Sequence, residues 1–127
     1  MKKIIIVVLC LMGMELYGQT TTTDDVGVAL RTGSSIELIK YFNTVTEVKI
    51  EDQGANYSKI QAESVIKDFF AKYPADNFEY IHKGSSPEGL KYNIGRYSYK
   101  GGSFRVVMLL KKVDDTYVID TINFNKE

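Results

Sequence analysis

The spacing of apolar residues changes once along the chain, after Pro74, and this change constrains the fold more than any other feature. Before it, apolar side chains recur every three or four residues, most clearly in residues 62–70, as on one face of a helix. From Asn77 onward they alternate or run together, as they do in strands. Two or three helices followed by strands in hairpin succession predict an α+β fold of helices packed on an antiparallel sheet. The length of 127 residues allows one domain.

Helix-capping residues predict where the first two helices begin and end. Asp24 or Asp25 can cap a short helix that ends at Gly33, where a left-handed residue is favoured. Ser34 and Glu37 have the spacing of a capping box and predict a second helix. An apolar stripe at helical spacing follows this box through residue 42, and Asn43 interrupts it.

The next segments predict a strand, a loop and the strongest helix of the chain. Residues 45–50 alternate loosely and predict a strand with one solvated face, and residues 52–57 predict a turn or loop. The helix is expected to begin after Ser58, where Gln61 completes a second capping box, and to end before Pro74.

The apolar stripe of this helix contains Phe69 and Phe70. Such a stripe is far more often core than a cofactor site. We therefore expect at least one of the two phenylalanines to point into the sheet.

The strand pattern predicts which side chains share a face of the sheet. Phe78, Tyr80 and His82 alternate and are expected on one face, and Gly95 suggests a bulge or bend in its strand. Residues 104–110 are apolar on nearly both faces and predict a central strand. In the last strand, Ile119 and Tyr117 are expected to oppose three other apolar residues, Val118, Ile122 and Phe124.

The N-terminus has the pattern of a secretory signal peptide. Two lysines precede an apolar run of eleven residues, 4–14, which is shorter than the roughly 20 residues that span a bilayer. We expect residues 1–18 to be the signal peptide, residues 19–23 a flexible lead-in, and residues 24–127 a single domain in the periplasm or the extracellular medium. An uncleaved membrane anchor is the alternative. Cys10 lies in mid-run after two bulky residues, which disfavours a lipoprotein.

Composition excludes several functional classes. Sixteen basic and sixteen acidic residues give no net charge, whereas binding to nucleic-acid phosphates normally needs a basic excess. One histidine and one cysteine leave too few ligands for a catalytic zinc site. The sequence also lacks the glycine-rich and nucleophile motifs of nucleotide-binding proteins and hydrolases. We therefore expect no metal, no cofactor and no nucleic-acid partner.

Two polar residues within apolar strands are the candidates for catalysis. Asp120 lies between Ile119 and Ile122, and burial without a cation would raise its pKa toward that of a general base. An edge position, or a salt bridge to Arg96 or Arg105, is the more frequent situation. His82 could act as an acid or base in a pocket, although a hydrogen-bonded strand histidine near the rim is again more common.

A candidate ligand-binding set combines tyrosines with polar groups of the same strands. Tyrosine hydroxyls on rigid apolar rings suit the lining of a pocket as well as a core. The expected set is Tyr80, His82, Tyr92 and Arg96.

The order of elements and five stretches resemble a known family. The stretches are 38–43 (LIKYFN), 57–73 (YSKIQAESVIKDFFAKY), 81–86 (IHKGSS), 92–95 (YNIG) and 104–112 (FRVVMLLKK). They resemble a family of small exported bacterial proteins of unknown function with the nuclear transport factor 2-like, or cystatin-like, fold. The resemblance implies a curved sheet that wraps a helix to form a cone.

The resemblance leaves three kinds of function open, one of which is a structural partner domain in an envelope assembly. The superfamily includes isomerases, dehydratases and plain binding domains, so the fold does not define the activity. Because no catalytic motif of its enzymes can be matched residue by residue, we expect a non-catalytic binding domain for a small apolar or amphipathic ligand or a protein partner. The alternative is a cofactor-free isomerase or dehydratase that transfers a proton through Asp120 or His82.

The apolar character of both faces of the central strand predicts self-association. If Phe104, Val106, Met108 and Leu110 face the helices, Val107 and Leu109 lie on the opposite face. One layer of helices cannot cover both faces, and an exposed apolar face usually marks an interface. We expect a homodimer with Val107 and Leu109 near its centre.

Overall fold

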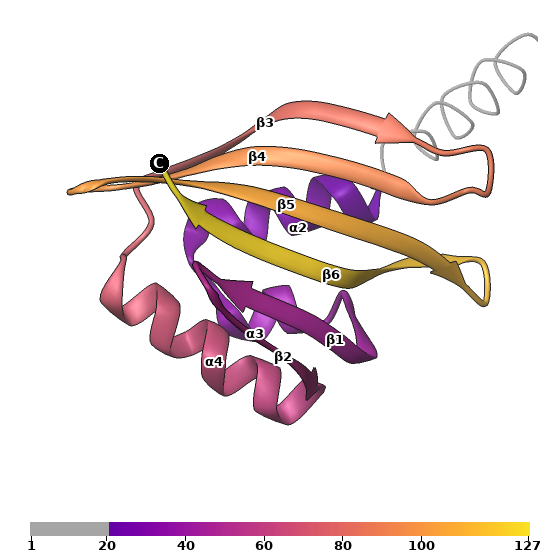
Figure 1. Ribbon diagram of the computed structural model, residues 1–127, viewed down its shortest axis with the longest axis horizontal. Coiled ribbons are helices and arrows are strands. Elements are labelled where there is room, and N and C mark those ends of the chain that lie inside the picture. The colour runs from indigo at the N-terminus through magenta and orange to yellow at the C-terminus, as the bar shows by residue number, and fades with distance from the viewer. Residues whose placement is uncertain (1–20) are drawn as a thin grey trace, which may run out of the picture.

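The computed structural model describes residues 21–127, so the expected signal peptide and its cleavage site lie outside the described residues. The helices and strands follow in the predicted order, apart from one strand that was expected to be a loop (Figure 1). The elements are α2 (Thr22–Thr32), α3 (Ser35–Ile39), β1 (Phe42–Ile50), β2 (Gln53–Ser58), α4 (Lys59–Lys72), β3 (Asn77–Ser85), β4 (Lys91–Tyr99), β5 (Gly102–Val113) and β6 (Thr116–Lys126).

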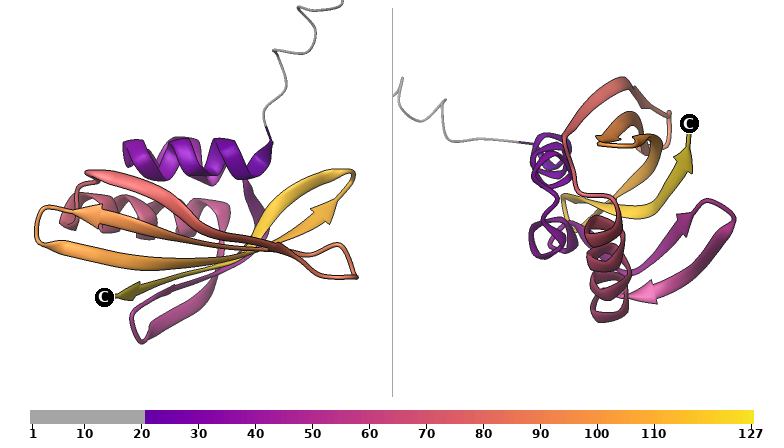
Figure 2. Two further views of the ribbon diagram at one scale, coloured as in Figure 1. Left: turned by 90° about the horizontal axis from the view of Figure 1, so that it is seen from above. Right: turned by 90° about the vertical axis from the view of Figure 1, so that its left-hand side faces the viewer.

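Six strands form one curved sheet in the order β2-β1-β6-β5-β4-β3. The three helices of the described residues lie along one side of it (Figure 2). The fold is thus α+β, with the helices packed on a curved sheet, as expected. The sheet is mixed, rather than antiparallel throughout as the sequence predicted, because β1 and β6 pair in parallel while all other pairs are antiparallel.

The first helix begins earlier than predicted. Thr21 is the N-cap of α2, and its side chain accepts a hydrogen bond of 3.1 Å from the backbone amide of Asp24. Thr23 is helical and only 7% exposed, so the fold starts within the segment expected to be a flexible lead-in. A threonine hydroxyl caps a helix almost as well as aspartate, and the aspartates then lie in the first turn, near the positive end of the helix dipole. Gly33, with φ of 66°, ends the helix as predicted.

Two segments between α2 and α4 differ from the prediction. α3 ends at Ile39 and Phe42 already belongs to β1, so the stripe through residue 42 is not one helix; Ile36 within it is 65% exposed. The expected loop 52–57 forms most of β2, an edge strand paired with β1. Five of its six residues are exposed, so the strand has none of the apolar alternation that would reveal it.

The longest helix, α4, has both bonds of the predicted capping box. The Ser58 hydroxyl accepts from the amide of Gln61, and the Gln61 side chain accepts from the amide of Ser58. Its buried stripe consists of Ala62, Ile66, Phe69 and Phe70. Both phenylalanines therefore face the core, as the spacing predicts.

Aromatic side chains fill the space between α4 and the sheet. The ring centroid of Phe69 lies 4.4 Å from that of Phe124, 5.0 Å from Phe104 and 5.4 Å from Tyr97. These three strand residues are fully buried. Aromatic side chains therefore fill the space between α4 and strands β4, β5 and β6.

The central strand β5 has the predicted faces. Phe104, Val106, Met108 and Leu110 are fully buried under the helices, whereas Val107 and Leu109 lie half-buried on the outer face, the side of the sheet away from the helices. The last strand does not repeat this pattern. A β-bulge at Asp120 shifts the register, so that Ile119, Ile122 and Phe124 all lie in the core. The expectation that Ile119 opposes the other two is wrong because the bulge adds one residue between them.

Candidate functional site

A second bulge divides the predicted ligand-binding set between the two faces of the sheet. Tyr80 pairs with Gly95, but His82 pairs with Ile94, so Ile81 is the extra residue. Because a bulge resets the alternation of side chains, Tyr80 stays with Phe78 on the helix side while His82 lies on the outer face. The prediction that Phe78, Tyr80 and His82 share a face is therefore wrong.

Tyr80 is held against the first helix. Its hydroxyl donates a hydrogen bond of 2.6 Å to the carbonyl of Thr23, and a Cβ at Gly27 would lie 3.0 Å from its ring. Burial raises the pKa of the Tyr80 hydroxyl well above its ordinary value, with a further contribution from the nearby Asp24 carboxylate. Tyr80 thus joins α2 to β3 through a neutral, bonded hydroxyl.

The other three predicted ligand residues are on the outer face of the sheet. His82 is exposed, Tyr92 is 44% exposed, and the Arg96 Nε donates to Glu127 Oε1 at 2.9 Å. This hydrogen bond lowers the pKa of the Glu127 carboxyl, and Ser103 adds a second bond at 3.0 Å. Arg96 therefore has a partner within the chain.

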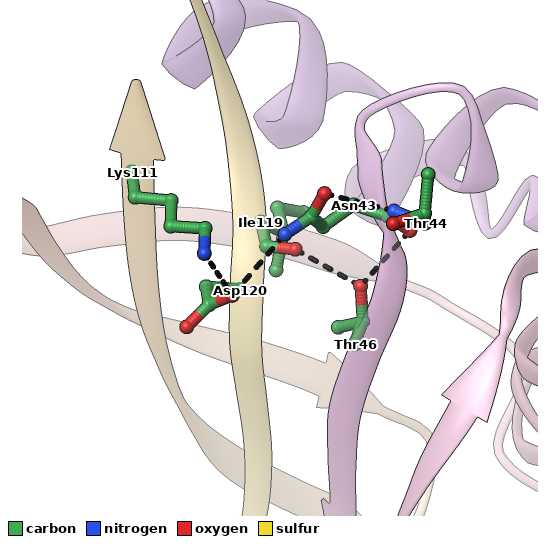
Figure 3. A network of polar contacts seen from close by, with 6 residues as sticks. All are labelled: Asn43, Thr44, Thr46, Lys111, Ile119 and Asp120. Carbon is green, nitrogen blue, oxygen red and sulfur yellow. Dashed lines mark hydrogen bonds and ion pairs between the residues drawn. The ribbon is translucent and has the colours of Figure 1, made fainter. Parts of the chain in front are cut away.

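Asp120 takes part in a network between the two parallel strands (Figure 3). Its carboxylate lies 3.5 Å from Lys111 Nζ and accepts from Asn43 Nδ2 at 3.4 Å, with the side chain 32% exposed. Its ion-pair partner is Lys111, rather than the predicted Arg96 or Arg105. The Thr46 hydroxyl donates to the Ile119 carbonyl at 3.0 Å. The ladder between β1 and β6 is irregular between Phe42 and Glu47, and these side-chain bonds connect the strands there.

The two candidate catalytic residues lie far apart. Asp120 is on β6 and His82 on β3, with β5 and β4 between them. Three strand spacings correspond to about 14 Å across the sheet. The pair cannot contact one substrate atom, so the arrangement offers no two-residue proton relay.

A hollow of about 540 Å³ lies between α4 and the turn that joins β1 to β2. We call it the α4 hollow; its lining is Ile50, Glu51, Asp52, Gln53, Val65, Asp68, Phe69, Lys72 and Tyr73. Ligand sites usually have volumes of 300–1,000 Å³. The lining is apolar at its floor, where Phe69 is 3% exposed and Val65 and Tyr73 are half-buried.

Charged groups surround this floor. Glu51, Asp52 and Asp68 are exposed carboxylates, and Lys72 is the one cation of the lining. The Lys72 ammonium also lies 5.4 Å from the centre of the Tyr73 ring, within the range of a cation–π contact. The α4 hollow can therefore accept an apolar body and a positively charged head.

Sequence reasoning missed the α4 hollow for a physical reason. Phe69 and Tyr73 read as core positions of a helix, and residues 51–53 read as a turn. Only the packing of α4 beside the β1–β2 hairpin brings them together. The structure adds that Glu51 in this turn has a φ of 55°, a left-handed conformation in which a residue other than glycine is strained.

The strain at Glu51 gives a testable prediction. Glu51→Gly should raise the free energy of unfolding by about 1 kcal/mol, because glycine adopts this conformation without the Cβ clash. Chemical denaturation measures the change. Asp52→Gly is the matched control, since φ of Asp52 is not positive, and it should give no gain. Equal stabilisation by both variants would contradict the assignment of strain to Glu51.

The described residues add two further observations. Within residues 21–127, no group of three or more histidine, cysteine, aspartate or glutamate side chains is arranged to hold a metal ion. Over the same residues, no helix is long and apolar enough to cross a membrane.

The curved sheet with its helices on one side defines the class of the protein, the nuclear transport factor 2-like fold. Crystal structures of two proteins of unknown function with this fold are similar to the chain. The one from Silicibacter pomeroyi has 10% identity and a TM-score of 0.59, covering 83% of this chain and 89% of the other. At this identity the likeness concerns the fold alone. The second, from Shewanella oneidensis, has 13% identity and a TM-score of 0.59, covering 82% and 93%.

The chain belongs to the DUF4783 family, a domain of unknown function, which matches residues 23–125. A family member from Bacteroides ovatus is 32% identical, with a TM-score of 0.77 over 81% of this chain and 93% of the other. Another, from Bacteroides uniformis, is 29% identical, with a TM-score of 0.79 over 84% and 98%. No curated protein matches the sequence. The expected family and fold are confirmed.

Proposed function

We propose that this protein is an exported binding domain without a catalytic site, and that its α4 hollow binds a small amphipathic molecule with a cationic head. The observation that carries the proposal is that the floor of the hollow is apolar while its rim is mainly acidic. Its floor offers Phe69, Val65 and Tyr73, while its rim has three carboxylates against one ammonium group. An apolar body would be removed from water on the floor, and a cationic head would meet the carboxylates.

The arrangement of polar residues favours binding over the isomerase or dehydratase alternative. General acid–base catalysis needs a group within hydrogen-bond reach of the substrate proton, beside a site that holds the substrate. Asp120 is paired with Lys111 and Asn43, and the exposed His82 lies three strands away. Neither lines the α4 hollow.

Two closely matched compounds test the proposal: 4-phenylbutylamine and 4-phenylbutyrate share an apolar body and carry opposite charges. In amide NMR titrations, the amine should shift the backbone signals of Ile50, Asp52 and Val65 until they saturate. It should also bind several-fold more tightly than the acid. Raising the salt to about 0.5 M should reduce this preference, because exposed charges are screened.

Variants distinguish binding at the α4 hollow from attraction of the amine to the overall charge of the protein. Glu51→Gln combined with Asp68→Asn should remove the preference for the amine while leaving the fold intact. Asp114→Asn is the control, because it removes one carboxylate from the β5–β6 turn, away from the hollow. If neither compound binds, or if the double variant and the control behave alike, the α4 hollow is not the ligand site.

Export is the second part of the proposal and rests on residues 1–18, with their two lysines and apolar run. We expect the protein recovered from the cell envelope or the medium to begin at Gln19. N-terminal sequencing or intact-mass measurement checks this. A chain that retains Met1 and stays in the cytosol would contradict export.

We also infer that the outer face of the sheet pairs two copies of the chain. Val107 and Leu109 are half-buried there, and Asn123 lies beside Val107 across β5 and β6. A second copy docked on this face would cover the two apolar side chains and remove them from water.

Sedimentation equilibrium tests this assembly. The protein should sediment at twice the monomer mass, and Leu109→Lys should convert it to a monomer, because a charge at the centre of an interface is desolvated without a partner. Val113→Lys is the control, since Val113 is the last residue of the same strand and is 37% exposed. A monomeric parent protein at high micromolar concentration would rule out the dimer.

A further inference from the structure

A second hollow, of about 330 Å³, lies where α2 begins, against the ends of β3 and β4 that meet in their hairpin. We call it the α2 hollow. The side chains that matter for its chemistry are Thr23, Asp24, Lys83, Lys91 and Asn93. It is distinct from the α4 hollow, with which it shares no lining residue.

The floor of the α2 hollow is a buried polar pair with unused hydrogen-bonding capacity. Asn93 is 2% exposed and Thr23 is 7% exposed, and Asn93 Nδ2 donates to Thr23 Oγ1 at 3.1 Å. Among residues 21–127, Asn93 Oδ1 accepts no hydrogen bond, although the side chain lines the hollow. An amide oxygen can accept up to two hydrogen bonds, so Asn93 Oδ1 at the floor can accept one from water or from a bound molecule.

Two lysine side chains also line the α2 hollow. Lys83 pairs directly with Asn93 across β3 and β4, and Lys91 lies two residues before Asn93, so all three side chains share one face. The Lys83 Nζ lies 4.9 Å from the Tyr80 ring centre, and the Lys91 Nζ lies 4.2 Å from that of Tyr117. Within the described residues neither lysine has a carboxylate within ion-pair distance. The two cations outnumber the single carboxylate of Asp24 in the lining.

We propose that the α2 hollow binds a small organic carboxylate that carries a hydroxyl beside the carboxylate, a 2-hydroxy acid. The carboxylate would lie between Lys83 and Lys91, where charge-assisted hydrogen bonds are strong. The hydroxyl would donate to Asn93 Oδ1. The positive end of the α2 dipole adds to the attraction, since the eleven-residue helix begins at the hollow. The volume of about 330 Å³ is sufficient for a ligand of this size.

The experiment compares lactate with acetate, which lacks the hydroxyl, and with sodium chloride at equal ionic strength. In amide NMR titrations of the purified protein, lactate should shift the signals of Thr23, Gly84 and Asn93 saturably, with a Kd of about 1 mM. Acetate should bind several-fold more weakly, and chloride should cause no saturable shift. Equal binding of lactate and acetate would overturn the role of Asn93.

Lysine variants test the carboxylate contact without touching the buried pair. Lys83→Gln with Lys91→Gln should weaken lactate binding about tenfold or more, because two charge-assisted contacts are lost. Lys111→Gln with Lys112→Gln removes the same charge elsewhere and should leave binding unchanged. The proposal is overturned if lactate gives no saturable shift at about 50 mM, well above the expected Kd, or if the two double variants lose affinity equally. Binding of 4-phenylbutylamine at the α4 hollow is independent of these outcomes.

Discussion

Replacing Phe69 with alanine is expected to lower the free energy of unfolding by about 3–5 kcal/mol. Phe69 is 3% exposed, and its ring contacts side chains from three strands, with centroids 4.4 Å from Phe124, 5.0 Å from Phe104 and 5.4 Å from Tyr97. Truncation removes these contacts and leaves a cavity that the surrounding rings cannot fill without leaving their rotamers. The loss is a large part of the total stability of a domain of this size.

Urea denaturation measures the effect, and the same helix provides the control. Ile60 is 84% exposed on α4, so Ile60→Ala should change the free energy of unfolding by less than about 0.5 kcal/mol. If Phe69→Ala unfolds at the same urea concentration as the parent protein, α4 does not pack on the sheet as described. Because Phe69 also forms the floor of the α4 hollow, the variant should bind 4-phenylbutylamine more weakly.

The helix that carries Phe69 could be predicted from the sequence because all its local signals agree. Ser58 and Gln61 form the capping box, the apolar stripe has one period throughout, and Pro74 follows the end. The faces of β5 were predictable for a similar reason, since an uninterrupted strand keeps its alternation over residues 104–110.

The two bulges could not be predicted, and they determine where the candidate site residues lie. At each bulge the strand gains one residue, Ile81 in β3 and Asp120 in β6. An alternating pattern read across such a position assigns every later residue to the wrong face. This is why His82 was expected beside Tyr80, and why Ile122 and Phe124 were expected away from Ile119.

The hollows depend on contacts between segments distant in sequence. The α4 hollow joins a β-turn to a helix face, and the α2 hollow joins the start of a helix to two strands. No spacing rule links Thr23 to Asn93, which are 70 positions apart and hydrogen-bonded. Asn93 was not singled out from the sequence, because a lone asparagine in a strand does not reveal whether neighbouring residues form hydrogen bonds with its side-chain amide.

Gly95 marks the point where the β3 bulge is accommodated, and Gly95→Ala is expected to lower the free energy of unfolding by about 3 kcal/mol. The glycine suggested a bulge in its own strand, but the bulge lies opposite, in β3. A Cβ on Gly95 would lie 2.3 Å from Cζ of Phe78 and 2.9 Å from the carbonyl oxygen of Glu79. Phe78 is fully buried and packs edge-on against Tyr80, with centroids 5.0 Å apart, so its ring has no free space to enter.

Alanine ordinarily stabilises a strand by about 0.5–1 kcal/mol relative to glycine, which is less than the loss of stability expected for Gly95→Ala. Gly84→Ala is the control: its Cβ would meet mainly the imidazole of exposed His82, at 3.1 Å, which can rotate away. A double-mutant cycle separates the clash from other effects. In the Gly95→Ala background, Phe78→Leu should cost less than it does in the parent protein, because the smaller side chain relieves the overlap. If Gly95→Ala is as stable as the parent protein, the Phe78 ring does not lie over Gly95, and the register that puts Tyr80 and His82 on opposite faces is wrong.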